Sequence, residues 1–286
     1  MCAVLRELFT HDPVETHLAN DGVADLDQDA SLRQELATFV CEGQYARGLE
    51  RVLQSYLTHL SREQQPGVWV SGFYGSGKSH FGKMLLHLWA DHPFADGASP
   101  RGVARLSQGV KDALAELSTA GNRTGGLVAA GGKLSPHRPL RRQLLALVLG
   151  ATGLPTDYTT ARLVIWLKDE GIFDAVQKSV EAQKHSFERE LSRMHVSRSL
   201  ARGLLEAMPD LAKDVAGALE AVRAQFPSLD PGTDIGDDGL VSVMRQALGD
   251  QVLACAHIGS TAVPGMPARP VTCTVQFSGS IGACAR

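Results

Sequence analysis

The sequence predicts an α/β fold in which a strand, a glycine-rich loop and a helix follow one another directly. A short apolar run at 68–70 follows Pro66 and Gly67, and residues 72–79 have the form Gly-x-x-x-x-Gly-Lys-Ser. Apolar residues then recur at helical spacing until Pro93. An apolar run bounded by Pro and Gly is typical of a buried parallel strand. We therefore expect a P-loop NTPase core within residues 66–250, incomplete in this chain.

Helices are predicted on both sides of this unit. Residues 1–65 form a helical N-terminal region, in which three- and four-residue apolar steps predict two helices separated near Gly43. The residues concerned are Leu32, Leu36, Phe39 and Val40, and then Leu49, Val52, Leu53, Tyr56 and Leu57. Another helix is expected at 101–117, and a helical insertion with segments near 139–150, 159–183, 185–207 and 210–225. The intervening residues 119–138 are rich in Gly and Pro and favour a loop.

Composition and charge narrow the classes of partner. The chain has 286 residues, 44% of them hydrophobic, which is enough for an ordinary core without disulfides or metals. A formal charge of -3 points neither to nucleic acid nor to an anionic membrane. No segment has the roughly 20 apolar residues of a membrane span, so we expect a cytoplasmic protein. The five cysteines form no Cys-x-x-Cys pair, and we expect no zinc site.

The glycine-rich segment is the candidate binding site. Glycines 72, 75 and 77 permit backbone conformations that turn N–H groups inward as a nest for an anion, and the following helix adds its N-terminal N–H groups. Lys78 would reach the β- and γ-phosphates of a nucleoside triphosphate, and the Ser79 hydroxyl would bind Mg²⁺. We expect Phe73 and Tyr74 to pack against the protein or to shield the phosphates. The predicted ATP and Mg²⁺ site comprises Gly72, Phe73, Tyr74, Gly75, Ser76, Gly77, Lys78, Ser79 and His80.

Hydrolysis would also require an acidic residue after a second apolar strand. The segment 163–170 ends in Asp169 and Glu170, but Lys168 stands where a strand should remain apolar. Apolar residues across 158–177 recur at helical steps, and we interpret this segment as a helix. No catalytic residue is assigned. The Gly-Gly-Lys sequence at 131–133 lacks the spacing of a phosphate loop, because residues 127 and 134 are both Leu.

The last 36 residues differ in composition from the rest. From Gln251 to Arg286 there is no Asp, Glu or Lys, although 21% of the whole chain is charged. Such a change indicates either an out-of-frame end or a disordered tail, and we retain both interpretations.

The segment 67–81, Gly-Val-Trp-Val-Ser-Gly-Phe-Tyr-Gly-Ser-Gly-Lys-Ser-His-Phe, resembles a known family. Together with the segments 5–9 and 35–40, it is similar to the large P-loop proteins of bacterial phage-exclusion (BREX) and phage-growth-limitation systems, called BrxC or PglY. The resemblance covers about the first 90 residues and carries over to Gly72, Gly75, Gly77, Lys78 and Ser79. It implies an AAA+-like core and a role in antiphage defence beside other phage-defence proteins. It also allows a homo-oligomer and an indirect association with DNA.

Two other functions fit the same residues. One is a regulatory module that binds ATP without hydrolysing it, and the other is a P-loop ATPase of a DNA-translocation or signalling system. In the resembled family the acidic strand lies near the position where this sequence changes character, at Gln251. The resemblance therefore leaves hydrolysis by this chain open.

Overall fold

A computed structural model describes residues 29–60, 67–73, 75–135, 138–230, 232–249, 252–257 and 273–278. This part of the chain is mostly helical and contains one small sheet. The helices are α1 (Asp29–Ala37), α2 (Gly43–His59), α3 (Lys78–Ala90), α4 (Pro100–Val103), α5 (Gln108–Thr124), α6 (Leu140–Ala151), α7 (Tyr158–Asp169), α8 (Phe173–Ala182), α9 (Phe187–Ser192), α10 (Arg198–Ala207), α11 (Val215–Gln225) and α12 (Asp237–Leu248). The strands are β1 (Gly67–Val70), β2 (Leu127–Gly132), β3 (Val252–His257) and β4 (Cys273–Ser278).

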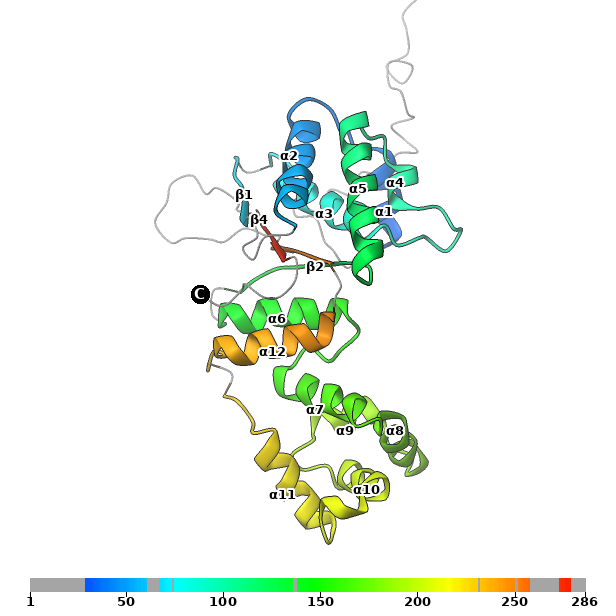
Figure 1. The fold of residues 1–286 in the computed structure, drawn as a ribbon, viewed down its shortest axis with the longest axis vertical. Coiled ribbons are helices and arrows are strands. Elements are labelled where there is room, and N and C mark those ends of the chain that lie inside the picture. The colour runs from blue at the N-terminus through cyan, green and yellow to red at the C-terminus, as the bar shows by residue number, and fades with distance from the viewer. Residues whose placement is uncertain are drawn as a thin grey trace, which may run out of the picture.

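The sheet lies between two helical layers. Figure 1 shows α1–α5 on one side of the strands and α6 with α12 on the other, and α3 and α6 each contact both β2 and β3. The strand order is β1-β4-β3-β2. The pair β2–β3 is parallel, whereas β4 is antiparallel to both β1 and β3. Because β4 reverses direction, β1 and β3 point the same way without being neighbours.

The prediction of a buried parallel strand before the loop is wrong. β1 is an edge strand paired antiparallel with β4, and its residues alternate between exposed and half-buried. Val68 and Val70 pack against the core, while the Trp69 side chain is 66% exposed. The alternation follows from the period of two along a strand that has a core on only one face. Three apolar residues in a row do not reveal this difference.

The first hydrophobic core joins the N-terminal helices to the loop helix. Leu36 of α1, Leu53 of α2, Met84 of α3 and Leu114 of α5 are all buried in this one cluster. The two helices predicted within residues 1–65 are therefore found, and they pack around α3. Val40 departs from its predicted stripe and is exposed, because α1 ends before it.

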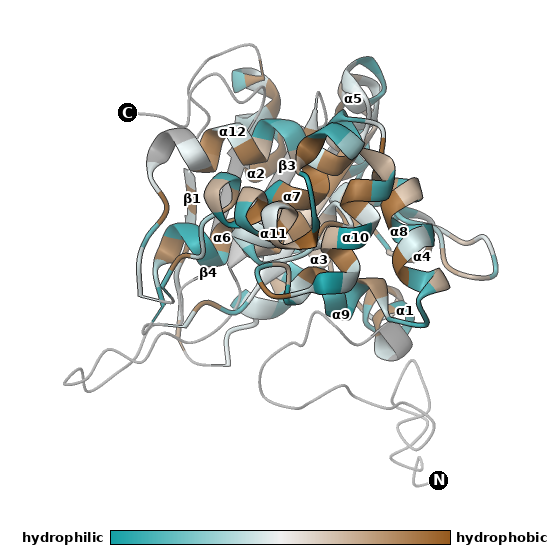
Figure 2. Ribbon diagram, turned by 90° about the horizontal axis from the view of Figure 1, so that it is seen from below, coloured by the Kyte–Doolittle hydropathy of each residue, from teal (hydrophilic) through white to brown (hydrophobic). Residues whose placement is uncertain are grey.

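The second core holds α6–α12, an arrangement of amphipathic helices in which hydrophobic and hydrophilic residues alternate along each ribbon (Figure 2). The predicted segments 159–183 and 185–207 are each split into two helices. Side-chain caps explain several starts: Asp157 accepts from Thr160 N, and the Ser186, Ser197 and Asp214 side chains cap α9, α10 and α11. Helix α12 was not predicted.

The prediction of a loop at 119–138 is also wrong. Helix α5 continues to Thr124 and ends at Gly125 with φ of 95°, a left-handed C-cap that suits glycine. Strand β2 follows at once, with Val128 and Ala130 buried. The glycines at 125 and 126 therefore separate a helix from a strand and do not indicate irregular structure.

Two segments of the atypical C-terminal region, Val252–His257 and Cys273–Ser278, form strands in the middle of the sheet. The remainder of residues 251–286 lies outside the described residues. Neither strand contains an Asp or a Glu.

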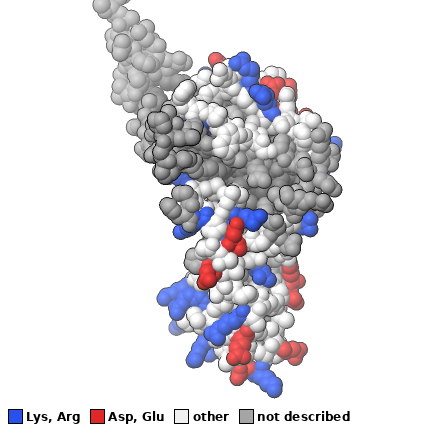
Figure 3. All heavy atoms as spheres, turned by 90° about the vertical axis from the view of Figure 1, so that its left-hand side faces the viewer, with Lys and Arg blue, Asp and Glu red and all other residues white. Residues whose placement is uncertain are grey.

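The described surface carries both signs of charge. On the face shown in Figure 3, Lys and Arg side chains alternate with Asp and Glu over the α7–α11 end of the molecule. Among the described residues, no helix has both the length and the apolar character that crossing a bilayer requires.

Candidate functional site: the glycine loop before helix α3

The loop between β1 and α3 has the left-handed backbone conformation at two of the three glycines for which it was predicted, Gly75 and Gly77, and not at Gly72. Gly75 and Gly77 have φ of 76° and 77°, in the left-handed region that side chains disfavour. Gly77 is the N-cap of α3, so Lys78 and Ser79 stand in the first turn of a helix of 13 residues. The N-terminal N–H groups of a helix carry a partial positive charge. The loop therefore leads into a helix N-terminus, where an anion can bind.

Tyr45 of α2 fixes the middle of the loop. Its hydroxyl donates a hydrogen bond to the Ser76 carbonyl oxygen, with 2.6 Å between the two oxygens. A Cβ atom at Gly77 would lie 2.1 Å from the same hydroxyl. Position 77 consequently requires glycine for two reasons, the positive φ and the close approach of Tyr45. Gly72 is similarly confined, because a Cβ there would lie 2.7 Å from Ser76 Oγ.

Lys78 is turned back into the loop. Its Nζ donates hydrogen bonds to the Phe73 carbonyl oxygen and to Ser76 Oγ, and the residue is 6% exposed. Taking an ammonium group out of water is costly unless polar groups or an opposite charge replace the water. A carbonyl and a hydroxyl supply only partial negative charge, and a bound phosphate oxygen would supply a full one. Lys78 thus holds a position from which it can interact with an anion on the loop.

The first turns of α3 are tied to α1 by a buried cluster of charged groups. The Lys83 Nζ donates to Glu35 Oε1 at 2.9 Å, and the two side chains are 1% and 12% exposed. Ser31 Oγ donates to the same carboxylate oxygen at 2.7 Å, and His80 Nδ1 lies 3.6 Å from the other oxygen. His80 also meets the Phe39 ring edge to face, with 5.6 Å between centroids. The cluster fixes the helix that follows the loop.

Burial and pairing shift the pKa values of this cluster. Burial alone would raise the pKa of Glu35, but hydrogen bonds from Ser31 and Lys83 outweigh it, and the net effect lowers the pKa. Burial lowers the pKa of His80 below its ordinary 6.5, and Glu35 offsets this only in part. At neutral pH Glu35 is therefore a carboxylate and His80 a neutral imidazole.

An open pocket of about 740 Å³ lies beside the loop. Two cationic side chains and four aromatic rings border it: Arg51, Lys78, Tyr45, Trp69, Phe73 and Phe81. The Phe73 side chain is 86% exposed and therefore does not pack against the protein, contrary to one of the two roles expected for it. The pocket is large enough for a nucleotide, since small-molecule sites generally occupy roughly 300–1,000 Å³.

Most residues of the predicted site are in place around this pocket. Gly72, Phe73, Ser76 and Lys78 line it, and Gly75, Gly77, Ser79 and His80 complete the loop and the first turn of α3. Tyr74 lies outside the described residues. The Ser79 hydroxyl is half-buried and is an oxygen ligand of the kind that Mg²⁺ accepts. Sequence reasoning missed Tyr45, Glu35 and Lys83, because nothing in their local pattern signals contacts 31 or 48 residues away.

The acidic residues considered for hydrolysis lie elsewhere. Asp169 ends helix α7 and Glu170 is its C-cap, so the helical interpretation of this segment is confirmed. Leu163 and Leu167 of the same helix are buried in the second core, not in the core around α3. In the described ranges, no group of three or more His, Cys, Asp or Glu side chains could hold a metal ion.

No protein-family model matches this chain, and no solved structure matches it.

Proposed function

We propose that this chain binds ATP with Mg²⁺ at the loop formed by residues 72–80. The observation that carries the proposal is the position of Lys78: its ammonium group is buried inside a glycine loop at the N-terminus of α3 and is held there by the Phe73 carbonyl and Ser76 hydroxyl oxygens. A lysine in this position can donate to phosphate oxygens when a triphosphate enters the loop.

Each residue type in the loop has a defined part in this binding. The positive φ values at Gly75 and Gly77 let successive N–H groups turn toward an anion. Lys78 neutralises charge on the β- and γ-phosphates, and the Ser79 hydroxyl is the ligand we assign to Mg²⁺. A bound Mg²⁺ ion would be held by the Ser79 hydroxyl and would offset the negative charge of the phosphates. Arg51 and the exposed Phe73 border the same pocket and can contact the nucleotide beyond the phosphates.

The resemblance of the segment 67–81 supports a more specific proposal, in which the chain corresponds to the N-terminal part of an antiphage-defence (BREX) ATPase with an AAA+-like core. Such a protein would act in the cytoplasm beside other phage-defence proteins, with an indirect association with DNA and a homo-oligomeric site. A P-loop ATPase of a DNA-translocation or signalling system shares the loop, so these partners rest on the resemblance alone.

One observation favours ATP binding without turnover. Strand β3 is the apolar strand parallel to β2, yet neither it nor the residue after it is acidic, and β2 ends in Gly131 and Gly132. A hydrolytic site of this class requires a carboxylate at the end of a neighbouring strand to complete the Mg²⁺ shell. A module that uses ATP occupancy as a switch therefore remains the second candidate function.

Calorimetric titration of the full chain with ATP and Mg²⁺ tests the proposal. Lys78→Ala removes charge-assisted hydrogen bonds worth roughly 1.5–3 kcal/mol, so the Kd should rise by about 10- to 150-fold. Lys78→Met retains the buried hydrocarbon and should lose as much affinity, which separates the charge from the packing.

The matched control is Lys133→Ala, because Lys133 follows the second Gly-Gly pair and is exposed. Its affinity should equal that of the wild type. Equal affinities of wild type and Lys78→Met, with both proteins folded by circular dichroism, would refute the site.

A further inference from the structure

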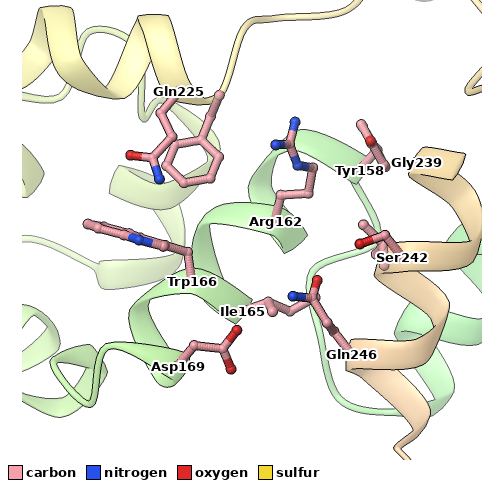
Figure 4. Close-up of a pocket in the computed structure, with 11 residues that line it drawn as sticks. Tyr158, Arg162, Ile165, Trp166, Asp169, Gln225, Gly239, Ser242 and Gln246 are labelled. Atoms are coloured by element: carbon pink, nitrogen blue, oxygen red, sulfur yellow. The ribbon is translucent and has the colours of Figure 1, made fainter.

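A second pocket, of about 340 Å³, lies in the helical part of the chain and is separate from the loop. Its floor is one face of α7, formed by Arg162, Ile165, Trp166 and Asp169 at steps of three and four residues. Facing residues of α12, at 239, 242, 243 and 246, repeat the same spacing. The end of α11 closes the third side with Gln225 and Phe226. Figure 4 shows these side chains converging on a common space.

Arg162 is preorganised for an anion. Its guanidinium lies 5.7 Å from the centroid of the Tyr158 ring and 5.6 Å from that of Phe226. Such packing holds the planar group in one orientation and leaves its N–H edge available. In the part of the chain that the structure describes, no carboxylate or carbonyl oxygen accepts a hydrogen bond from Arg162. An anionic group with at least two oxygens, such as a phosphate, can accept two parallel hydrogen bonds from this guanidinium group.

The walls favour a flat ring attached to that anion. Trp166 is half-buried and stands 5.8 Å from the Phe226 ring, which gives the pocket an aromatic side. Gln225, Gln246 and Ser242 add amide and hydroxyl groups around it. Gly239 keeps the pocket in shape, since a Cβ there would lie 2.6 Å from the Tyr158 hydroxyl. Aromatic faces with amide groups nearby are the usual means of holding a nucleobase.

The separation of the two charged residues decides the size of the ligand. Asp169 follows Arg162 by seven residues on one helix, which is about 10 Å along the axis. An amino acid carries its ammonium and carboxylate groups on one carbon and cannot reach both side chains. A nucleotide places its phosphate and the N–H donors at the far edge of its base at the two ends of the molecule. Asp169 would accept from those donors and would repel a second phosphate.

We propose that this pocket binds one nucleoside monophosphate unit, with the phosphate on Arg162 and the base against Trp166. The unit could be a free mononucleotide or part of a single strand, because both present the same phosphate and base. The pocket is a second site whose role does not depend on ATP binding at the loop.

Binding of AMP and of a ten-nucleotide single-stranded DNA is measured by calorimetry with the full chain, in both the wild-type and the Lys78→Ala background. The second background weakens binding at the glycine loop, so a contribution from that site would fall while binding at this pocket would not. Trp166→Leu should weaken binding by about 5- to 100-fold, the range expected for loss of one base stack. Arg162→Gln removes charge-assisted hydrogen bonds to the phosphate and should weaken binding by about 10- to 150-fold. Trp166→Phe keeps an aromatic face and should retain most of the affinity.

The matched control for Arg162→Gln is Arg198→Gln, which changes the same residue type at an exposed position outside this pocket. The control for Trp166→Leu is Trp166→Phe, which keeps the aromatic face. If the DNA binds more tightly than AMP and this binding is lost in the pocket variants, the natural ligand is a single strand. If only AMP binds, the natural ligand is a free mononucleotide. The proposal is wrong if neither ligand binds, if the pocket variants bind as the controls do, or if ribose 5-phosphate binds as tightly as AMP.

Discussion

The ion pair between Glu35 and Lys83 should be the most sensitive electrostatic contact in the first core. We consider Glu35→Gln, which keeps the shape of the side chain and removes its charge. Lys83 is then left as a cation with 1% of its side chain exposed and no carboxylate at 2.9 Å. Its desolvation is no longer compensated, although the amide oxygen of the new Gln can still accept one hydrogen bond.

The expected loss follows from the burial of the pair. Removing one partner of a buried pair costs about 3–5 kcal/mol. Glu35 retains 12% exposure, so water can reach part of the site, and we expect a value near the lower end, about 3 kcal/mol. For a chain of this size that corresponds to a fall in Tm of roughly 6–12 °C.

Urea unfolding followed by circular dichroism measures this change, with Glu116→Gln, at an exposed position of α5, as the control. The control should remain within about 0.5 kcal/mol of the wild type. The double variant Glu35→Gln/Lys83→Met removes the isolated cation and should recover most of the lost stability. If Glu35→Gln unfolds like the control, or if the double variant is no more stable than the single one, the ion pair does not hold α1 to α3 as argued.

Three further outcomes are expected. Because burial lowers the pKa of His80, the unfolded chain takes up a proton first as the pH falls below about 6.5, so stability should decrease there, and His80→Gln should flatten the unfolding free energy between pH 6.5 and 5. Gly77→Ala combines a positive φ with an approach of 2.1 Å to the Tyr45 hydroxyl, so it should lower the Tm and weaken ATP binding in calorimetry; unchanged values would contradict the loop geometry. The full chain should show negligible steady-state phosphate release from ATP, and activity that disappears in Glu170→Gln would overturn this expectation.

The sequence predicted those parts of the fold that depend on local pattern. Helices α2 and α3 follow from their apolar stripes, and the loop between β1 and α3 follows from its glycines, since both signals act within a few residues. The sheet was less predictable. Whether Val68 and Val70 belong to a buried or an edge strand depends on β4, more than 200 residues later.

The candidate site divides in the same way. The identity and order of the residues from Gly72 to His80 were accessible from spacing, because the backbone conformation at each glycine restricts the residue type. The contacts of Tyr45 and Glu35 were not, since helical spacing shows only that these residues lie on α2 and α1. A tyrosine on a helix can contact many different groups, and its hydrogen bond to the Ser76 carbonyl oxygen is evident only in the folded chain.

The hydrogen bond from Tyr45 to the Ser76 carbonyl has a mechanical consequence. It joins the most constrained part of the loop to a helix of 17 residues that packs on α5. The peptide group of Ser76 cannot rotate toward an incoming ligand without pulling on this helix or breaking the bond. The conformation of the loop and the position of α2 are therefore coupled through this one hydrogen bond.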